Sequence, residues 1–501
     1  MTQDMPPSDD KPPAAPQIRP RRIIRNVIWM TGSGFVTRLI AFAISVFLAR
    51  VVGAAGFGAL GSALAFVSYF KGIVNAGLDA YATRDTAERH ERIPALYARV
   101  IGARLALAGV SSLLIWASLL ILPEQLARHA DLIVIYGLIL FAEAIATEWA
   151  IRGIERMALI AAGTVVQHLI MAAGILLFLP GREDSLWIVP AAHVASLFIM
   201  QGWFYWVLRA HFAPLRPSFA WGKITGVVKD SLSVAFGKAL RLFYYQGDVL
   251  LLALLATQAS AGEFFASHRI ILVGVMVGAI YQTNAYPTTS RLITHDPASA
   301  VRFQSDIMRY ALSLLAPAVV LGAWYAKPLI LLVFGNDFPN TPAIFTIMIF
   351  SVPLFIFSMG AQNLLLAAAM GRQVLIGNAV AVAVHVGLAL ILIAPFAGVG
   401  AAWACLAGEI VCALAMVLIV KRRFGVVPLQ RRMLAPLAAA GAMAGGLALA
   451  STLSIYAQLG LAGLVYGVLA LVLRTLSRAE LHFFKDFAKD AILRLVRGKK
   501  P

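Results

Sequence analysis

The stretch VIWMTGSGFVTRLIAFAISVFLARV (Val27–Val51), followed shortly by FGALGSALAFVSYFKGIVNA (Phe57–Ala76), decides the fold of this chain. Each run is apolar over nearly its whole length. A helix needs about 20 mostly apolar residues to cross the hydrocarbon core of a bilayer, and both runs are long enough. We therefore predict two membrane-spanning helices joined by a short loop.

Apolar runs of this length recur to the end of the sequence. They cover Val100–Leu122, Leu132–Trp149, Met157–Leu179, Trp187–Leu208, Leu232–Leu255, Phe264–Tyr286, Tyr310–Leu332, Ala343–Met370, Val374–Ile393, Gly400–Val420, Leu434–Leu453 and Ile455–Leu473. Composition agrees, because apolar residues make up 60% of the chain, charged residues only 13%, and the mean hydropathy is +0.82. A soluble protein keeps roughly 25% of its residues charged. The sequence predicts an all-α polytopic membrane protein with about fourteen transmembrane helices.

The formal charge of +18 would suggest nucleic acid as a partner in a soluble protein. In a membrane protein it indicates basic loops on the cytoplasmic side, together with cations that serve an anionic ligand, so we expect no nucleic acid. With the N-terminus placed inside, the opposite loops hold only Arg50, Arg128 and Arg182. This sorting predicts a multi-pass membrane protein with both termini in the cytoplasm.

Two six-helix units explain several short internal similarities. Arg38-Leu39 resembles Arg241-Leu242, and Ala55-Gly56 resembles Ala261-Gly262, in the same order and topology. Transporters are often built from such repeats, with the substrate site between the halves. We predict a disordered cytoplasmic tail (1–25), an N-lobe (26–210), an inter-lobe linker (211–229), a C-lobe (230–425), a further helix pair (426–475) and a basic amphipathic helix on the inner leaflet (476–501).

No cofactor is indicated by the sequence. Cys405 and Cys412 share one helical face without a cluster of His or Asp beside them, which favours ordinary packing over a metal site or a disulfide. The chain has no phosphate-binding Gly-x-x-x-x-Gly-Lys-[Ser/Thr] loop, so a gradient or the membrane potential must drive any active transport.

An ordered series of short motifs resembles a known family. It includes Asn26-Val27-Ile28-Trp29, the run Leu48–Gly58, Arg152–Arg156, Tyr244–Asp248 and Val333–Phe338. These residues resemble Wzx-type polysaccharide flippases of the multidrug/oligosaccharidyl-lipid/polysaccharide (MOP) exporter superfamily. The resemblance implies a V-shaped, two-lobed bundle that alternates between inward-open and outward-open states and carries an undecaprenyl-pyrophosphate-linked glycan. Gln246 stands where the family often has a basic residue.

Five basic residues inside predicted spans are candidates for substrate binding. A charge at mid-bilayer costs roughly 2.5–3.5 kcal/mol, so it usually faces protein or a wet cavity. A pyrophosphate needs Arg or Lys to enter such a cavity, and Arg38 and Arg241 occupy matching places in the two repeats. The candidates are Arg38, Arg241, Arg269, Lys71 and Lys238. The alternative is that these residues form ion pairs within a lobe, such as Arg241 with Asp248, or extend toward headgroups.

Acidic residues inside the spans could bind a coupling proton or sodium ion. Asp248 and Glu143 are the candidates for coupling or for an ion pair. Asp79 and Glu148 lie near predicted helix ends, where solvation explains them. The single histidines in apolar runs are interpreted as packed, hydrogen-bonded side chains; they are His168, His193 and His385.

Three functions compete. The first is a lipid-linked oligosaccharide flippase for O-antigen, capsule or exopolysaccharide synthesis, acting with membrane lipids and with polysaccharide polymerase or assembly proteins. The second is a cation-coupled drug antiporter of the same superfamily, which would need an acidic cavity. The third is a membrane glycan polymerase or ligase, which would need a large outer loop, whereas the predicted outer loops are short. The first accounts best for the cations, and it makes the protein a transporter, not an enzyme.

Overall fold

The computed structural model describes residues 20–121, 123–182, 184–212, 215–218, 246–473 and 475, and within these ranges it contains helices but no strand. The first half of the chain forms α1 (Pro20–Asn75), α2 (Leu78–Glu88), α3 (Ile93–Leu119), α4 (Glu124–Ala127), α5 (Ala130–Gly137), α6 (Ile139–Ala144), α7 (Glu148–Gly153), α8 (Met157–Phe178) and α9 (Ile188–Arg209), with a 3-10 turn η1 (His90–Arg92). Residues 1–19 of the predicted tail, the predicted amphipathic helix and most of the predicted linker lie outside the described residues, whereas residues 20–25 of the predicted tail form the start of α1.

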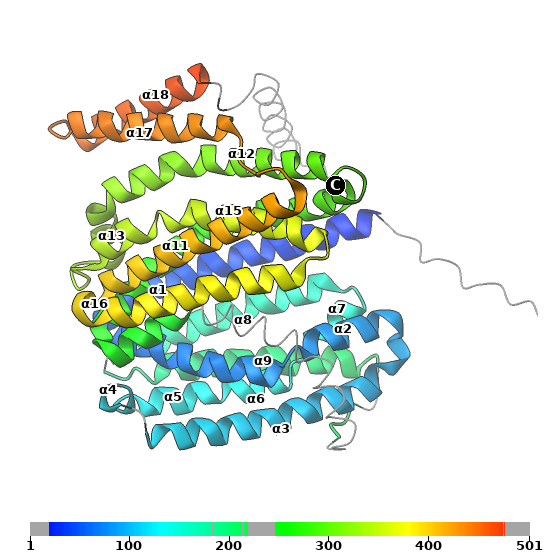
Figure 1. Ribbon diagram of the computed structural model, residues 1–501. Coiled ribbons are helices and arrows are strands. Elements are labelled where there is room, and N and C mark those ends of the chain that lie inside the picture. The colour runs from blue at the N-terminus through cyan, green and yellow to red at the C-terminus, as the bar shows by residue number, and fades with distance from the viewer. Residues whose placement is uncertain are drawn as a thin grey trace, which may run out of the picture.

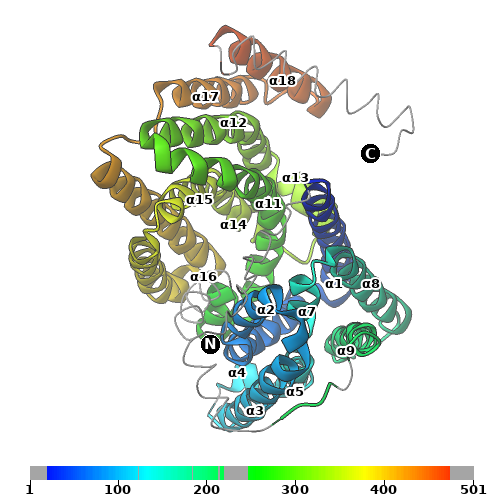
Figure 2. The ribbon, with the colours of Figure 1, turned by 90° about the vertical axis from the view of Figure 1, so that its right-hand side faces the viewer.

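The second half begins with the helical stretch Gln246–Leu255. It continues with α11 (Gln258–His295), α12 (Pro297–Trp324), α13 (Ala326–Phe334), α14 (Thr341–Met348), α15 (Ser351–Ala367), α16 (Gly371–Phe424), η2 (Arg431–Met433), α17 (Leu434–Leu449) and α18 (Ile455–Val472). The last pair packs on α12 through α17, on the outside of the bundle (Figure 2).

Ten helical segments of the described chain are long and apolar enough to cross a bilayer. Two of them contain two spans each, because α1 turns back at Gly53 (φ 65°) and α16 turns back at Ala397 (φ 46°) (Figure 1). Glycine adopts this left-handed conformation at little cost, which suits Gly53 to a tight reversal. With α11 and the stretch Gln246–Leu255, the arrangement confirms the predicted all-α, two-lobed membrane fold.

Two predicted spans are broken in the structure. The predicted span Leu132–Trp149 is divided among α5, α6 and α7, and Ala343–Met370 is divided between α14 and α15. Broken helices inside a membrane persist only where other protein groups take up the freed backbone hydrogen bonds. The break between α6 and α7 therefore identifies a place where polar side chains must enter the N-lobe.

The two lobes meet tightly at one end of the bundle. We call the end that carries α4 and α13 the α4 end, and the opposite end, where α2 and α7 lie, the α2 end (Figure 1). At the α4 end, a Cβ added to Gly58 of α1 would lie 1.8 Å from the carbonyl oxygen of Gln258. A Cβ added to Gly262 of α11 would lie 1.9 Å from the carbonyl oxygen of Ala54. Only glycine permits this approach of the two backbones.

Further contacts reinforce the closed α4 end. The rings of Phe57 and Phe265, one from each lobe, have centroids 4.9 Å apart. The Arg50 Nε donates to the carbonyl oxygen of Val333 at 2.8 Å, and its Nη2 donates to that of Leu332. Both carbonyls belong to the last turn of α13, where a helix leaves acceptors without intrahelical partners. The structure therefore shows the lobes joined at the α4 end.

The glycine contact leads to a prediction about stability. We expect Gly58→Ala and Gly262→Ala each to destabilise the purified protein by about 1–3 kcal/mol, the usual cost of overpacking, because the added methyl group would overlap a backbone carbonyl of the other lobe. Thermal unfolding measures the effect. Gly441→Ala is the matched control, since a Cβ at Gly441 would meet nothing within 4 Å. Equal melting temperatures for all three variants would contradict the close approach of α1 and α11.

Candidate functional site

A buried arginine hydrogen-bonds to the backbone at the break between α6 and α7. The Arg104 side chain on α3 is 0% exposed. Its Nη1 donates to the carbonyl oxygen of Ala146 at 3.2 Å, and its Nη2 donates to Asp79 Oδ1 on α2 at 2.7 Å. The Nε1 of Trp149 also donates to the Ala146 oxygen, at 3.1 Å. The carbonyl freed by the break is thus satisfied by side chains, as a membrane interior requires.

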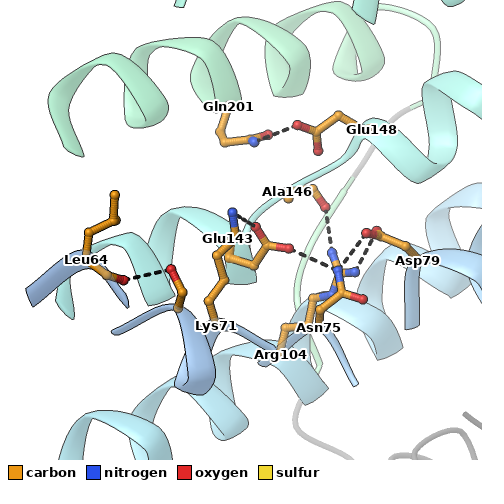
Figure 3. A network of polar contacts seen from close by, with 10 residues as sticks. Leu64, Lys71, Asn75, Asp79, Arg104, Glu143, Ala146, Glu148 and Gln201 are labelled. Carbon is orange, nitrogen blue, oxygen red and sulfur yellow. Dashed lines mark hydrogen bonds and ion pairs between the residues drawn. The ribbon is translucent and has the colours of Figure 1, made fainter. Parts of the chain in front are cut away.

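The polar contacts continue along the N-lobe (Figure 3). Asn75 Nδ2 donates to Asp79 Oδ2 at 2.6 Å and to Glu143 Oε1 at 3.0 Å. Lys71 Nζ lies 3.2 Å from Glu143 Oε2, and the Lys71 side chain is 43% exposed against 17% for Glu143. We call this set, with Arg104, the N-lobe network. It links α1, α2, α3 and α6, and Lys71 is its most exposed member.

A second contact lies near the N-lobe network but is separate from it. Gln201 on α9 donates through Nε2 to Glu148 Oε1 at 3.0 Å, and it lies apart from the Lys71 and Arg104 contacts in Figure 3. Gln201 is 4% exposed, and its Oε1 is buried without a hydrogen-bond partner. The sequence interpretation of Asp79 and Glu148 as solvated acids is therefore wrong, because both side chains bond to interior groups.

The C-lobe contains a buried acid and histidine. Asp248 Oδ1 and His385 Nε2 are 2.8 Å apart, and both residues are buried. Asp248 also lines a cavity of about 30 Å³ together with His268 and Glu409. Such a volume accommodates one or two water molecules or a small cation. Within the described ranges, no group of three metal-ligating side chains converges closely enough to hold a metal ion.

Arg269 differs from the other interior cations of the described chain. It lies about three turns into α11, and its guanidinium carbon is 4.3 Å from the centroid of the Phe265 ring. Its Nε is buried without a hydrogen-bond partner, and no carboxylate of the described residues forms an ion pair with it. It interacts electrostatically with Tyr136 and His193 of the N-lobe. Its charge therefore lies at the face between the lobes without an anion.

The other candidates have different environments. Arg38 is exposed on α1, whereas Lys238 and Arg241 lie outside the described residues. The pairing of Arg38 with Arg241 across the repeats thus stays a prediction. Lys71 and Glu143 form an ion pair within one lobe, and Asp248 bonds to His385.

Sequence reasoning did not single out Arg104. It is one arginine in the apolar run Val100–Leu122, and no neighbour in sequence shows its partners. The sequence signal that could have identified Arg104 was a charged residue in the middle of an apolar run. Such a charge is costly in a membrane, so it must find a partner inside the protein. The histidines agree with the packed interpretation, because His168 Nδ1 lies 2.8 Å from the Thr164 carbonyl oxygen and His193 lies edge-on to Tyr136.

Comparison with known protein families shows which family the chain belongs to. The model of the family described as "Polysaccharide biosynthesis protein" matches residues 23–293, more than half of the chain. The chain belongs to this family. An Escherichia coli (strain K12) protein named "Putative O-antigen transporter" is 23% identical over 262 residues, which cover 49% of this chain and 60% of that protein. The chain therefore aligns with only part of this relative's length.

Solved structures share the fold. The lipid II flippase MurJ, in an inward closed conformation, has a TM-score of 0.62 at 13% identity and covers 87% of this chain and 99% of its own. A MOP superfamily transporter from Pyrococcus furiosus has a TM-score of 0.54 at 15% identity, covering 82% and 97%. An inward-facing multidrug MATE transporter has a TM-score of 0.53 at 14% identity, covering 81% and 97%. The fold is that of the MOP superfamily, and the protein is a multi-pass membrane protein.

The role of Arg104 can be tested by removing one partner at a time. We expect Arg104→Met to destabilise the protein by about 2–4 kcal/mol, because the half-buried Asp79 would keep its charge without its cation and Ala146 would lose a donor. The double variant Arg104→Met/Asp79→Leu should recover part of the loss, since both charges are gone. Thermal unfolding measures both. Arg128→Met is the control, because the Arg128–Glu124 pair is exposed and should contribute under about 1 kcal/mol. A cost for Arg104→Met no larger than for this control would contradict the assignment.

Proposed function

We propose that this protein flips an undecaprenyl-pyrophosphate-linked oligosaccharide from the cytoplasmic to the periplasmic leaflet by alternating access. The observation that carries the proposal is the charge of Arg269 between the lobes, which no carboxylate of the described residues compensates. Membership of the polysaccharide biosynthesis family and the MOP fold support a lipid-linked glycan as the cargo. The glycan would serve O-antigen, capsule or exopolysaccharide synthesis.

The chemistry of Arg269 suits a pyrophosphate. A guanidinium presents several donors in a fixed plane, and it binds phosphate oxygens through two parallel hydrogen bonds. Contact with the Phe265 ring keeps the Arg269 side chain on one side and leaves its Nε without an acceptor. An anion between the lobes would satisfy this donor and compensate the charge. The same anion would lie close to Tyr136 of the other lobe.

A second contact would come from Lys71. Its side chain is the most exposed of the N-lobe network and already carries an acidic partner, Glu143. A pyrophosphate that enters from the N-lobe side can therefore share Lys71 with Glu143 without uncovering a buried charge. Arg38, Lys238 and Arg241 remain candidates in this proposal for the same anion.

The closed α4 end would be the periplasmic gate. Basic residues of the described chain gather at the α2 end, including Arg84, Arg152 and Lys421, whereas Arg50, Arg128 and Arg182 lie at the α4 end. By the positive-inside rule the α2 end faces the cytoplasm of a bacterial inner membrane, with the N- and C-termini on that side. Release of the cargo would then require separation of α1 from α11.

Coupling to a cation would occur in the C-lobe. The cavity beside Asp248 and Glu409 has room for a water or a small cation, and His385 can take up a proton. We propose a proton or a sodium ion as the coupling ion at this position. The cavity also fits the second candidate function, a cation-coupled drug antiporter, which the MATE-like fold permits. The test below separates the two.

The proposed role of Arg269 can be tested in cells. In a strain that lacks the native gene, the wild-type protein should restore the polysaccharide, and Arg269→Ala should not, because the pyrophosphate would lose its compensating charge. Mass spectrometry of polyprenyl-linked sugars should then show the complete repeat unit accumulating on the cytoplasmic face. Arg269→Lys should restore a part of the export, since lysine keeps the charge without the planar donors.

Arg128→Ala serves as the control, because Arg128 is exposed at the α4 end and should not affect export. Full export of the polysaccharide by the Arg269→Ala variant, at normal abundance in the membrane, would overturn the assignment of Arg269 to the pyrophosphate site. Changed sensitivity to cationic drugs without accumulation of any lipid-linked sugar would favour the antiporter.

A further inference from the structure

The interior of the N-lobe contains more acids than bases. Asp79, Glu143 and Glu148 lie close enough to one another and to Lys71 to interact electrostatically. The two described cations that bond to them are Lys71, paired with Glu143, and Arg104, paired with Asp79. Among the described residues, the one side chain that bonds to Glu148 is the amide of Gln201, and the Glu148 carboxyl also accepts a hydrogen bond from its own backbone N–H. Arg152 also interacts electrostatically with Asp79, but it is exposed to solvent. The two interior bases compensate two of the three acids, so the interior cluster is neutral only if the third acid carries a proton.

Glu148 is the acid whose surroundings suit a proton. An ionised carboxylate inside a membrane protein normally finds a cation or several hydrogen-bond donors. Among the described residues, Glu148 accepts one side-chain hydrogen bond, from Gln201, and forms no ion pair. Arg152, one turn further along α7, is exposed and forms no ion pair with it. Glu143 and Asp79 face it from α6 and α2 and disfavour a further negative charge.

The neighbouring polar atoms support the same assignment. The Oε1 of Gln201 is buried and lacks a donor, and so does the Oγ1 of Thr147, the residue before Glu148. A carboxylate brings only acceptors to this place, whereas a carboxylic acid brings one O–H donor. The amide of Gln201 can present either end to Glu148 by rotating about its last torsion, so it can donate to the ionised acid or accept from the protonated one.

We propose that Glu148 and Gln201 form a proton-binding site in the N-lobe, with the proton carried by the Glu148 carboxyl at neutral pH. This site is distinct from the cavity beside Asp248 in the C-lobe. Loss of the proton would place a third negative charge beside Glu143 and Asp79 and would change the contact between α7 and α9. The presence of the proton does not rest on the proposed function, whereas its use to drive flipping does.

Infrared difference spectroscopy of the full chain in lipid vesicles tests the proposal directly. Protonated and ionised carboxyl groups have separate C=O stretching bands. At neutral pH, Glu148→Gln should remove a protonated-acid band from the wild-type spectrum. Glu263→Gln is the matched control, because Glu263 is buried in the C-lobe and accepts hydrogen bonds from Asn340, as an ionised carboxylate does, whereas Glu148 is half-buried. It should remove carboxylate bands instead.

Loss of carboxylate bands in Glu148→Gln, with the acid band unchanged, would overturn the proposal. Should Glu148→Gln fail to fold, Glu148→Asp keeps the acid and should shift the same band without abolishing it. A spectrum of Glu148→Asp in which no acid band moves would also overturn it. Neither spectrum depends on the cargo, so a failure here leaves the flippase proposal untouched.

Stability against pH gives a second readout. Glu148→Gln should unfold at the wild-type temperature at neutral pH, because an amide replaces a neutral acid of the same shape. At alkaline pH the wild-type protein must carry the extra charge and should unfold at a lower temperature than Glu148→Gln. Glu143→Gln should instead unfold below the wild type at neutral pH, since Lys71 would lose its acidic partner. Identical profiles of unfolding temperature against pH for Glu148→Gln and the wild type would contradict the proposal that Glu148 carries a proton.

Discussion

The interior of a bilayer supplies no hydrogen-bond partner, so every polar group placed there must be satisfied by the protein itself. The break between α6 and α7 shows the effect of this requirement on the structure. Its free carbonyl at Ala146 draws in Arg104, Arg104 requires Asp79, and Asn75 links Asp79 to Glu143 and so to Lys71. One interruption of a helix thus accounts for the N-lobe network.

Two polar side chains of the described interior are less completely satisfied than the N-lobe network, and our proposals rest on them. Arg269 has an aromatic ring beside it and no anionic partner among the described residues, and it lies between lobes that are joined at one end by Gly58 and Gly262. Within the part of the chain that the structure describes, Glu148 accepts a hydrogen bond from an amide and forms no ion pair. We propose that the first binds an anion from outside the chain and that the second carries a proton. A flippase that exchanges a pyrophosphate-linked cargo and uses an ion gradient would need both.

The sequence predicted the membrane class, the approximate number of spans and the two lobes, because apolar runs of about 20 residues and sorted loop charges are local signals. It also placed Arg269 inside a span. It could not predict the Lys71–Glu143 or Arg104–Asp79 pairs, since each joins residues from helices distant in sequence. The interpretation of Glu148 as solvated failed for the same reason, because its partner Gln201 lies on α9.

Binding of a polyprenyl pyrophosphate tests the central claim most directly. Native mass spectrometry of the purified protein with undecaprenyl pyrophosphate, compared with undecaprenol, measures whether the pyrophosphate itself is recognised. The account predicts that the wild-type protein retains the pyrophosphate in preference to the alcohol and that Arg269→Ala loses this preference. Equal retention of both lipids by the wild type, or an unchanged preference in Arg269→Ala, would contradict a pyrophosphate site between the lobes.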